Sequence, residues 1–122
     1  MSLTGSERFP KTARLRKRPQ FLNLSLTGSK FHSPNFVVIS KSQDGLGNRL
    51  GITVSGKVGN SVVRNRIKRV VREVFRRHQS ALPPATDFLV IARNSAATLA
   101  NDLISSELDR AFSHPRIRRK SS

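Results

Sequence analysis

The sequence contains no cysteine, tryptophan or tyrosine, and no apolar run long enough to cross a membrane. Without cysteine the chain cannot form disulfides, bind zinc through thiolates or use a thiol nucleophile. The longest apolar runs, residues 36–39 and 88–92, are far shorter than the roughly 20 residues that span a bilayer. The basic N-terminus also lacks the apolar stretch of a secretory signal. We therefore expect a cytoplasmic protein with no membrane partner.

Acidic residues are also scarce, because only 7 aspartates and glutamates are scattered along the 122 residues. Asp102, Glu107 and Asp109 fall on one predicted helix, where exposure to water or helix capping explains them. The 3 histidines have no carboxylate at metal-ligand spacing. We therefore expect no metal cluster and no acid–base pair in this chain, and so no catalytic side chain of its own.

One short motif is similar to a nucleotide-binding loop. Residues 51–58 match the pattern G-x-x-x-x-G-K, but Val58 stands where a serine or threonine would bind magnesium. Residues 52–54 also have the composition of a strand interior, where the motif needs a loop. We therefore expect no nucleotide site, no organic cofactor and no small-molecule substrate.

Positive charge is what the sequence has in excess. The 23 lysines and arginines give a formal charge of +16, which indicates an anionic partner. Hydrophobic residues make up 36% of the chain, which is enough for one folded core at this length. We expect a flexible basic arm over residues 1–18, one α/β domain over residues 19–112 and a basic, disordered tail over residues 113–122.

Apolar spacing and turn residues predict an α+β domain of order α-β-β-β-α-β-α with a sheet of about four strands. The predicted elements are a helix over residues 19–28, strands over 30–32, 35–40 and 50–54, a helix over 61–79, a strand over 87–92 and a helix over 99–112. We interpret the first three strands as a meander. In the third strand Leu50, Ile52 and Val54 point to the core, whereas Thr53 and Ser55 lie on a shallow, open, polar face.

The predicted helix over residues 61–79 has two opposed faces. Ile67, Val70 and Val74 recur at helical spacing and form an apolar stripe, and Arg64 lies at the edge of this stripe. The polar side chains on the opposite arc are Asn65, Arg66, Lys68, Arg69, Arg72 and Arg76. Most neighbours on this arc are like-charged at spacings of three or four residues, and such pairs destabilise a helix.

A polyanion would relieve this repulsion, and the planar guanidinium of arginine suits phosphate. We therefore expect a nucleic acid on this face, with a membrane lipid surface or a purely structural role as the alternatives. RNA is favoured over DNA because the sequence shows no helix-turn-helix, zinc finger or basic zipper. Among the 7 phenylalanines we assign Phe75, Phe88 and Phe112 to the core, and we leave Phe21 and Phe36 open between core residue and exposed stacking platform.

Several segments taken together resemble one protein family. They are the block Arg64-Asn65-Arg66-Ile67-Lys68-Arg69, the upstream segments 51–55 and 57–60, the downstream segment 72–76, the residues Arg14 and Arg16 before Phe21, and the strand-like segment 87–93. In these positions the chain resembles the bacterial ribonuclease P protein component, over roughly residues 12–112.

This resemblance implies a fold and a set of partners. The fold is a compact α/β sandwich in which the basic helix follows the sheet through a left-handed crossover, as in the second domain of a small-subunit ribosomal protein. The implied activity is that of an accessory protein subunit of an endoribonuclease, in which a catalytic RNA subunit with Mg²⁺ hydrolyses the phosphodiester. The implied substrate is precursor tRNA, whose 5′ leader is removed to give the mature 5′ end.

The resemblance also implies residue roles. The residues expected to bind the RNA subunit are Arg64, Asn65, Arg66, Lys68, Arg69, Arg72 and Lys57. Those expected to line or flank a cleft for the precursor tRNA leader are Phe21, Phe36, Arg14, Arg16, Thr53 and Ser55.

The chain departs from the family's pattern at three positions. Gly56 stands where many members have a basic residue, and Ser25 and Ile39 stand where relatives often have aromatics. Backbone and electrostatic contacts are therefore expected to dominate in the cleft. The alternative interpretation of the whole chain is a ribosome-associated or general RNA-binding protein without a catalytic partner.

Overall fold

The computed structural model describes residues 28–43, 45 and 47–118. Its elements are the strands β1 (Ser29–His32), β2 (Phe36–Ser42), β3 (Arg49–Thr53) and β4 (Thr86–Ala92), the helices α2 (Ser61–His78), α3 (Asn101–Ser113) and α4 (Pro115–Arg118), and the 3₁₀ helices η3 (Gln79–Ala81) and η4 (Asn94–Thr98). The predicted arm over residues 1–18 and, apart from Gly28, the predicted helix over residues 19–28 lie outside the described residues.

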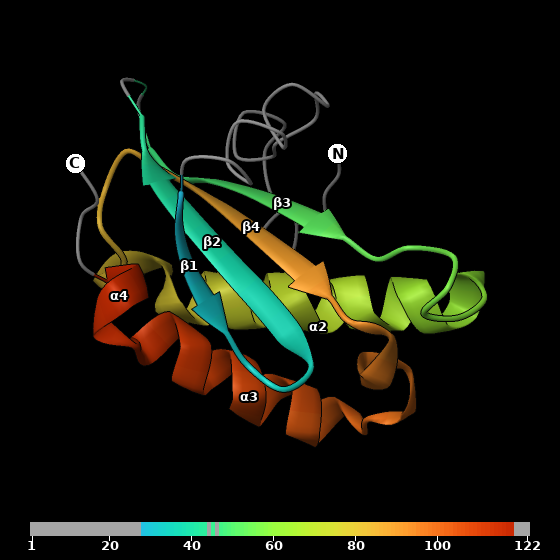
Figure 1. Cartoon of the computed structure of the whole chain (residues 1–122). Coiled ribbons are helices and arrows are strands. Elements are labelled where there is room, and N and C mark those ends of the chain that lie inside the picture. The colour runs from blue at the N-terminus through green and yellow to red at the C-terminus, as the bar shows by residue number, and fades with distance from the viewer. Residues whose placement is uncertain (1–27, 44, 46, 119–122) are drawn as a thin grey trace, which may run out of the picture.

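The strands form one 4-stranded sheet in the order β1-β2-β4-β3 (Figure 1). β2 is antiparallel to β1 and to β4, whereas β3 runs parallel to β4. The predicted meander is therefore wrong, because β4 lies between β2 and β3. β4 is buried along nearly its whole length, and a strand that is buried on both faces belongs inside a sheet rather than at its edge.

Helices α2 and α3 cover one face of the sheet and enclose the main core (Figure 1). Alternate residues of β2 and β4, such as Val38 and Phe88, point into this core. Phe75 of α2 and Phe112 of α3 meet Phe88 edge to face, with ring centroids 5.5 and 6.2 Å from it. The assignment of these three phenylalanines to the core is confirmed. None of the described helices is long and apolar enough to span a bilayer.

The other face of the sheet, called here the open face, carries the remaining residues of each strand, and none of the described helices covers it. Ile39 and Leu89 form a small buried cluster there, with Val37 and Ile91 half-buried beside them. Thr53 pairs with Ile91 and is exposed on this face. The predicted open face therefore exists at β3, but its centre is apolar rather than polar.

Residues 113–118 differ from the predicted disordered tail. α3 continues to Ser113, and the following residues form the short helix α4. Ile117 of α4 is fully buried in the main core, and its backbone N–H donates to the carbonyl of His114 at 2.9 Å. A single apolar residue among arginines has no periodicity, so its burial could not be predicted from the sequence.

Glu107 of α3 is buried, whereas the sequence predicted a solvated or capping role for it. Only 4% of the residue is exposed. Its carboxylate accepts hydrogen bonds from the Ser33 hydroxyl at 2.5 Å, the Asn35 backbone N–H at 2.7 Å and the Asn35 side-chain amide at 2.6 Å. Burial by itself would raise the pKa of Glu107, but the hydrogen bonds outweigh it and hold the pKa below its usual value. Glu107 thus holds the β1–β2 turn against α3.

We predict that Glu107→Gln lowers the free energy of unfolding by about 1–3 kcal/mol at neutral pH, because the amide places a donor against the donors of Asn35. Since the pKa of Glu107 is lowered by folding, its stabilising contribution is complete above the usual glutamate pKa and is lost as the pH falls through the folded pKa. The variant should therefore lose less stability in acid than the parent chain. Urea unfolding at a series of pH values measures both effects.

The control for this prediction is Ser106→Ala, which changes an exposed neighbour on the same helix. It should leave both the stability at neutral pH and the loss in acid unchanged. Parent-like stability of Glu107→Gln at neutral pH would contradict the proposed contribution of the carboxylate.

Candidate nucleic-acid interface

Helix α2 is positioned by its apolar stripe and by a cap at its first turn. Ile67, Val70 and Val74 are buried, as their periodicity predicts. The side-chain oxygen of Asn60 accepts a hydrogen bond from the backbone N–H of Val63 at 3.0 Å, which satisfies one of the free donors at the helix start. No acidic residue occupies the first turn. The positive end of the helix dipole is therefore left without a compensating charge from that turn.

The loop between β3 and α2 packs closely against the first turn of the helix. Val58 is buried in the main core, while Lys57 beside it is exposed. Arg64 donates from Nε to the carbonyl of Gly59 at 3.1 Å. A Cβ atom at Gly59 would lie only 3.0 Å from the Cβ of Val63, so any larger residue would displace Val63. Lys57 is thereby held beside the start of α2.

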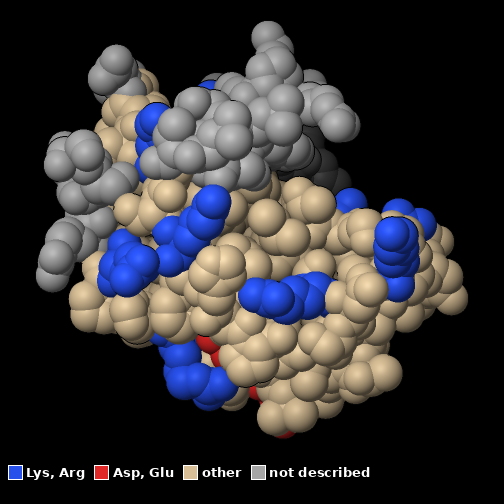
Figure 2. Space-filling view, viewed as in Figure 1, with Lys and Arg blue, Asp and Glu red and all other residues tan. Residues whose placement is uncertain are grey.

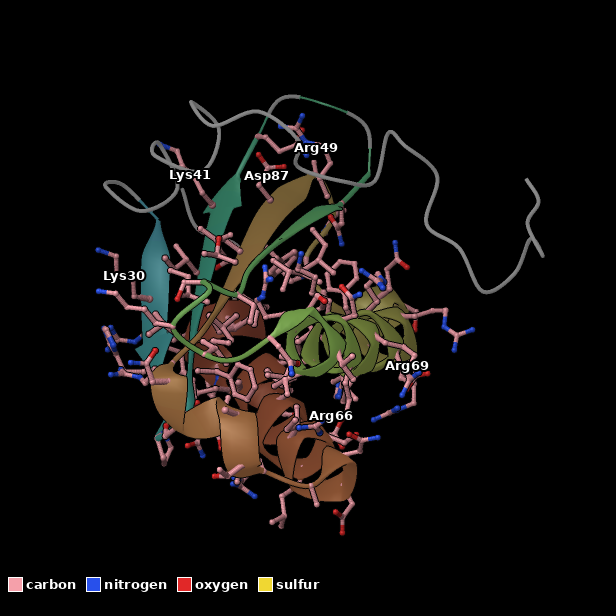
Figure 3. All side chains as sticks on the ribbon, turned by 90° about the vertical axis from the view of Figure 1, so that its right-hand side faces the viewer. Lys30, Lys41, Arg49, Arg66, Arg69 and Asp87 are labelled. Carbon is pink, nitrogen blue, oxygen red and sulfur yellow. The ribbon has the colours of Figure 1, made fainter. Side chains whose placement is uncertain are left out.

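Beyond Arg64, most polar side chains of α2 fall into two groups. The first group, called here the outward strip, faces away from the core and consists of Asn65, Lys68, Arg69, Arg72 and Arg76. Figure 3 shows Arg69 beside α2, on the side away from the sheet. Within the described part of the chain, neither Lys68 nor Arg69 forms a hydrogen bond or an ion pair. The donors of both side chains are therefore available to a partner.

Arg66 belongs to the second group, which faces α3. Its Nη1 donates to the carbonyl of Leu99 at 3.0 Å and to Oδ1 of Asn101 at 2.6 Å, and its Nη2 donates to the carbonyl of Ala97 at 3.3 Å. At about 100° per residue, Arg66 lies at the border of the polar arc that is nearest to α3. The structure therefore favours a link between α2 and the start of α3 over the predicted RNA contact of Arg66.

Arg77 and His78 link the other end of α2 to α3. Nη2 of Arg77 donates to the Ser105 hydroxyl at 3.0 Å and to Oδ1 of Asp109 at 3.2 Å. Nε2 of His78 lies 2.9 Å from the same oxygen of Asp109. Asp109 is therefore a partner of two α2 side chains, rather than the merely solvated or capping residue that the sequence suggested. Together with Arg66, these contacts fix the rotation of α2 and direct the outward strip to solvent.

Further cations lie at the ends of the open face. Arg49 forms a two-point ion pair with Asp87, with Nε–Oδ1 and Nη2–Oδ2 distances of 2.8 Å, and Lys41 lies at the same end of the sheet (Figure 3). The hydrogen bonds that Arg49 donates to Asp87 raise the pKa of Arg49 despite its partial burial. At the other end, Nη2 of Arg93 lies 3.3 Å from Nδ1 of His32. Figure 2 shows several separate lysine and arginine patches on one face, with little acidic surface among them.

The predicted leader cleft is described only in part. The members that lie outside the described residues are Arg14, Arg16 and Phe21. Thr53 and Ser55 are exposed, as expected. The placement of Phe36 in a cleft is wrong, because this side chain is fully buried in the main core. The register of β2 pairs Phe36 with Ala92 on the helix-covered face, so Val37 reaches the open face instead.

Comparison with known proteins gives a consistent result for most of the chain. A family model described as ribonuclease P matches residues 9–116. The chain is 45% identical to the ribonuclease P protein component of Citrifermentans bemidjiense over 94% of this chain and 97% of that protein. It is 43% identical to that of Desulfatibacillum aliphaticivorans over 88% of this chain and 92% of that protein.

Solved structures agree with the sequence comparison. The structure of Staphylococcus aureus RNase P protein superposes with a TM-score of 0.82 at 34% identity, covering 89% of this chain and 100% of that one. The RNase P protein from Thermotoga maritima gives a TM-score of 0.74 at 30% identity, covering 89% of this chain and 98% of that one.

We predict that Arg66→Ala lowers the free energy of unfolding by about 1–3 kcal/mol, because it removes the charged donor from two carbonyls and the Asn101 side chain. Arg66→Lys should restore only part of this loss, because an ammonium lacks the planar fork that reaches several oxygens at once. Arg69→Ala is the matched control from the outward strip and should change stability by less than about 0.5 kcal/mol. Chemical denaturation followed by circular dichroism compares the three variants, and equal stability of Arg66→Ala and Arg69→Ala would contradict the structural role of Arg66.

Proposed function

The chain belongs to the bacterial ribonuclease P protein family and takes part in tRNA processing as a ribonuclease P protein component, and from this premise we propose that its outward strip binds the RNA subunit. One observation supports this proposal most directly: some cations of α2 have partners within the protein, and others have none among the described residues. Arg66 and Arg77 bind α3, whereas Lys68 and Arg69 have no partner among the described residues. Unpaired cations on a rigid helix bind phosphates and release the counterions of the RNA, which favours association.

In this proposal the RNA subunit, with Mg²⁺, carries out the hydrolysis in the cytoplasm. Among the described residues, no three or more histidine or acidic side chains come together as metal ligands would. Asp87 binds Arg49, and Glu107 binds Ser33 and Asn35. These two carboxylates are thus already bound by donors of the protein. In this proposal the chain's own contribution is to bind and orient RNA.

The open face is proposed as the surface for the single-stranded 5′ leader of precursor tRNA. Its centre is apolar where Val37 and Ile91 are half-buried. Lys30 lies beside this centre, opposite Ile39, and Arg93 lies at one end of the face. Apolar surface suits the faces of unpaired bases, and the cations suit the phosphates between them. All phenylalanines among the described residues belong to the main core or pack against it. In this part of the chain, aliphatic and electrostatic contacts therefore replace aromatic stacking.

The test reconstitutes the chain with a ribonuclease P RNA at low magnesium concentration. We expect the chain to raise cleavage of leader-bearing precursor tRNA more than cleavage of a substrate that has almost no leader. A general RNA-binding protein would stimulate both substrates alike and would show no preference for this RNA over a ribosomal fragment. That result would contradict the proposal.

Two variants separate the two proposed surfaces in the same assay. Lys30→Ala should reduce the preference for the leader-bearing substrate a few-fold and leave the affinity for the RNA subunit unchanged. Arg69→Ala should weaken the affinity for the RNA subunit and leave the preference for the leader-bearing substrate unchanged, because Arg69 lies on the other side of the molecule from Lys30 (Figure 3). Identical effects of both variants on both readouts would contradict the assignment of separate surfaces.

A further inference from the structure

Glu73 is the one acidic residue of α2, and it has no hydrogen bond or ion pair within the described part of the chain. It lies four residues from Arg69 and from Arg77, a spacing at which opposite charges on a helix pair readily. Arg77 nevertheless donates to Ser105 and Asp109 of α3. Glu73 is exposed, so its carboxylate is available to a partner outside the chain.

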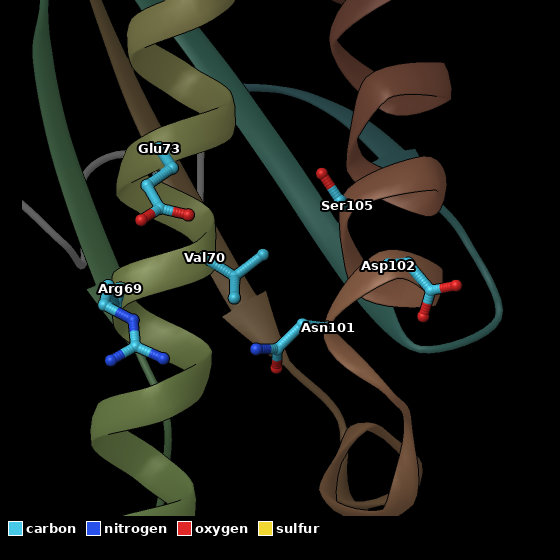
Figure 4. A pocket seen from close by; sticks show the side chains of 6 residues that line it. All are labelled: Arg69, Val70, Glu73, Asn101, Asp102 and Ser105. Carbon is cyan, nitrogen blue, oxygen red and sulfur yellow. The ribbon is translucent and has the colours of Figure 1, made fainter.

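Glu73 lines a groove between α2 and α3. The residues that line this groove are Arg69, Val70, Glu73, Asn101, Asp102 and Ser105. In Figure 4, Arg69 and Glu73 stand on the α2 side, Asn101 and Ser105 point toward them from α3, and Asp102 points away from α2. Arg69 is also part of the outward strip, so the groove opens directly beside the surface proposed for the RNA subunit.

The charge of Glu73 conflicts with a surface that binds only phosphates. A carboxylate next to bound phosphate repels it and weakens binding. The conflict disappears if Glu73 meets a group that donates hydrogen bonds. Unpaired bases of RNA supply such donors, because cytosine, adenine and guanine carry amino groups on their Watson–Crick edges, and carboxylates accept hydrogen bonds from such groups.

We propose that the groove between α2 and α3 binds an unpaired, amino-bearing nucleobase of the RNA subunit. Glu73 accepts a hydrogen bond from the amino group of the base, and the guanidinium of Arg69 stacks on its face, as arginine does on splayed-out bases. Polar groups of Asn101 and Ser105 line the opposite side. The proposal rests on the proposed function, because it adds a base-reading position to the same RNA-binding surface.

The test compares Glu73→Ala with Asp102→Ala in binding to ribonuclease P RNA over a series of salt concentrations. Each variant removes one negative charge from an exposed residue at this groove, so long-range electrostatics alone predicts tighter binding for both. We expect Glu73→Ala to bind about five- to tenfold more weakly instead, because a charge-assisted hydrogen bond is lost. Its salt dependence should match that of the parent, because no phosphate contact is lost. Asp102→Ala should bind slightly more tightly.

A third variant distinguishes failure of this inference from failure of the proposed function. If Arg69→Ala weakens binding while Glu73→Ala binds as tightly as the parent or more tightly, the nucleobase site is overturned and the RNA-binding strip stands. If Arg69→Ala also has no effect, both proposals are overturned. Thermal unfolding followed by circular dichroism confirms that the variants are folded before binding is compared.

Discussion

The burial of the apolar stripe of α2 is the interaction on which the rest of this molecule depends. In an isolated helix, each like-charged pair on the polar arc would cost about 0.2–0.5 kcal/mol. Ile67, Val70 and Val74 are buried, and each such side chain contributes about 1.5–3 kcal/mol on leaving water. Burial therefore outweighs the repulsion. The cations are thus presented on a helix whose position is fixed before any RNA binds.

The side chains on the flank of α2 complete this arrangement. Arg66 binds the segment that leads into α3, and Arg77 and His78 bind α3 through Ser105 and Asp109. Arg64, Arg66 and Arg77 of this strongly basic helix therefore donate hydrogen bonds within the protein, and we assign the outward strip to the RNA partner. On the far side of the sheet, none of the described helices covers the open face (Figure 1). In our proposal, one small domain offers this face and the outward strip to two different RNA segments.

Local patterns account for what the sequence predicted well. The limits of α2 and its buried stripe follow from helical periodicity, and the strands follow from short apolar runs between turns. Contacts between distant residues account for what it missed. Glu107 and Ser33 are 74 positions apart, and Arg66 reaches residues 31 to 35 positions away. The burial of Phe36 depends on its register with β4, and nothing local to residues 36–42 shows that register.

Our central claim is that RNA binds the outward strip while Arg66 serves the protein. The most direct measurement is the slope of log affinity for the RNA subunit against log salt concentration, for Arg69→Ala and Arg66→Ala, under conditions where both are folded. We expect the slope to fall by about 0.7–0.9 for Arg69→Ala, because one phosphate contact is lost, and to stay at the parent value for Arg66→Ala. A loss of slope in Arg66→Ala equal to that in Arg69→Ala would contradict the claim.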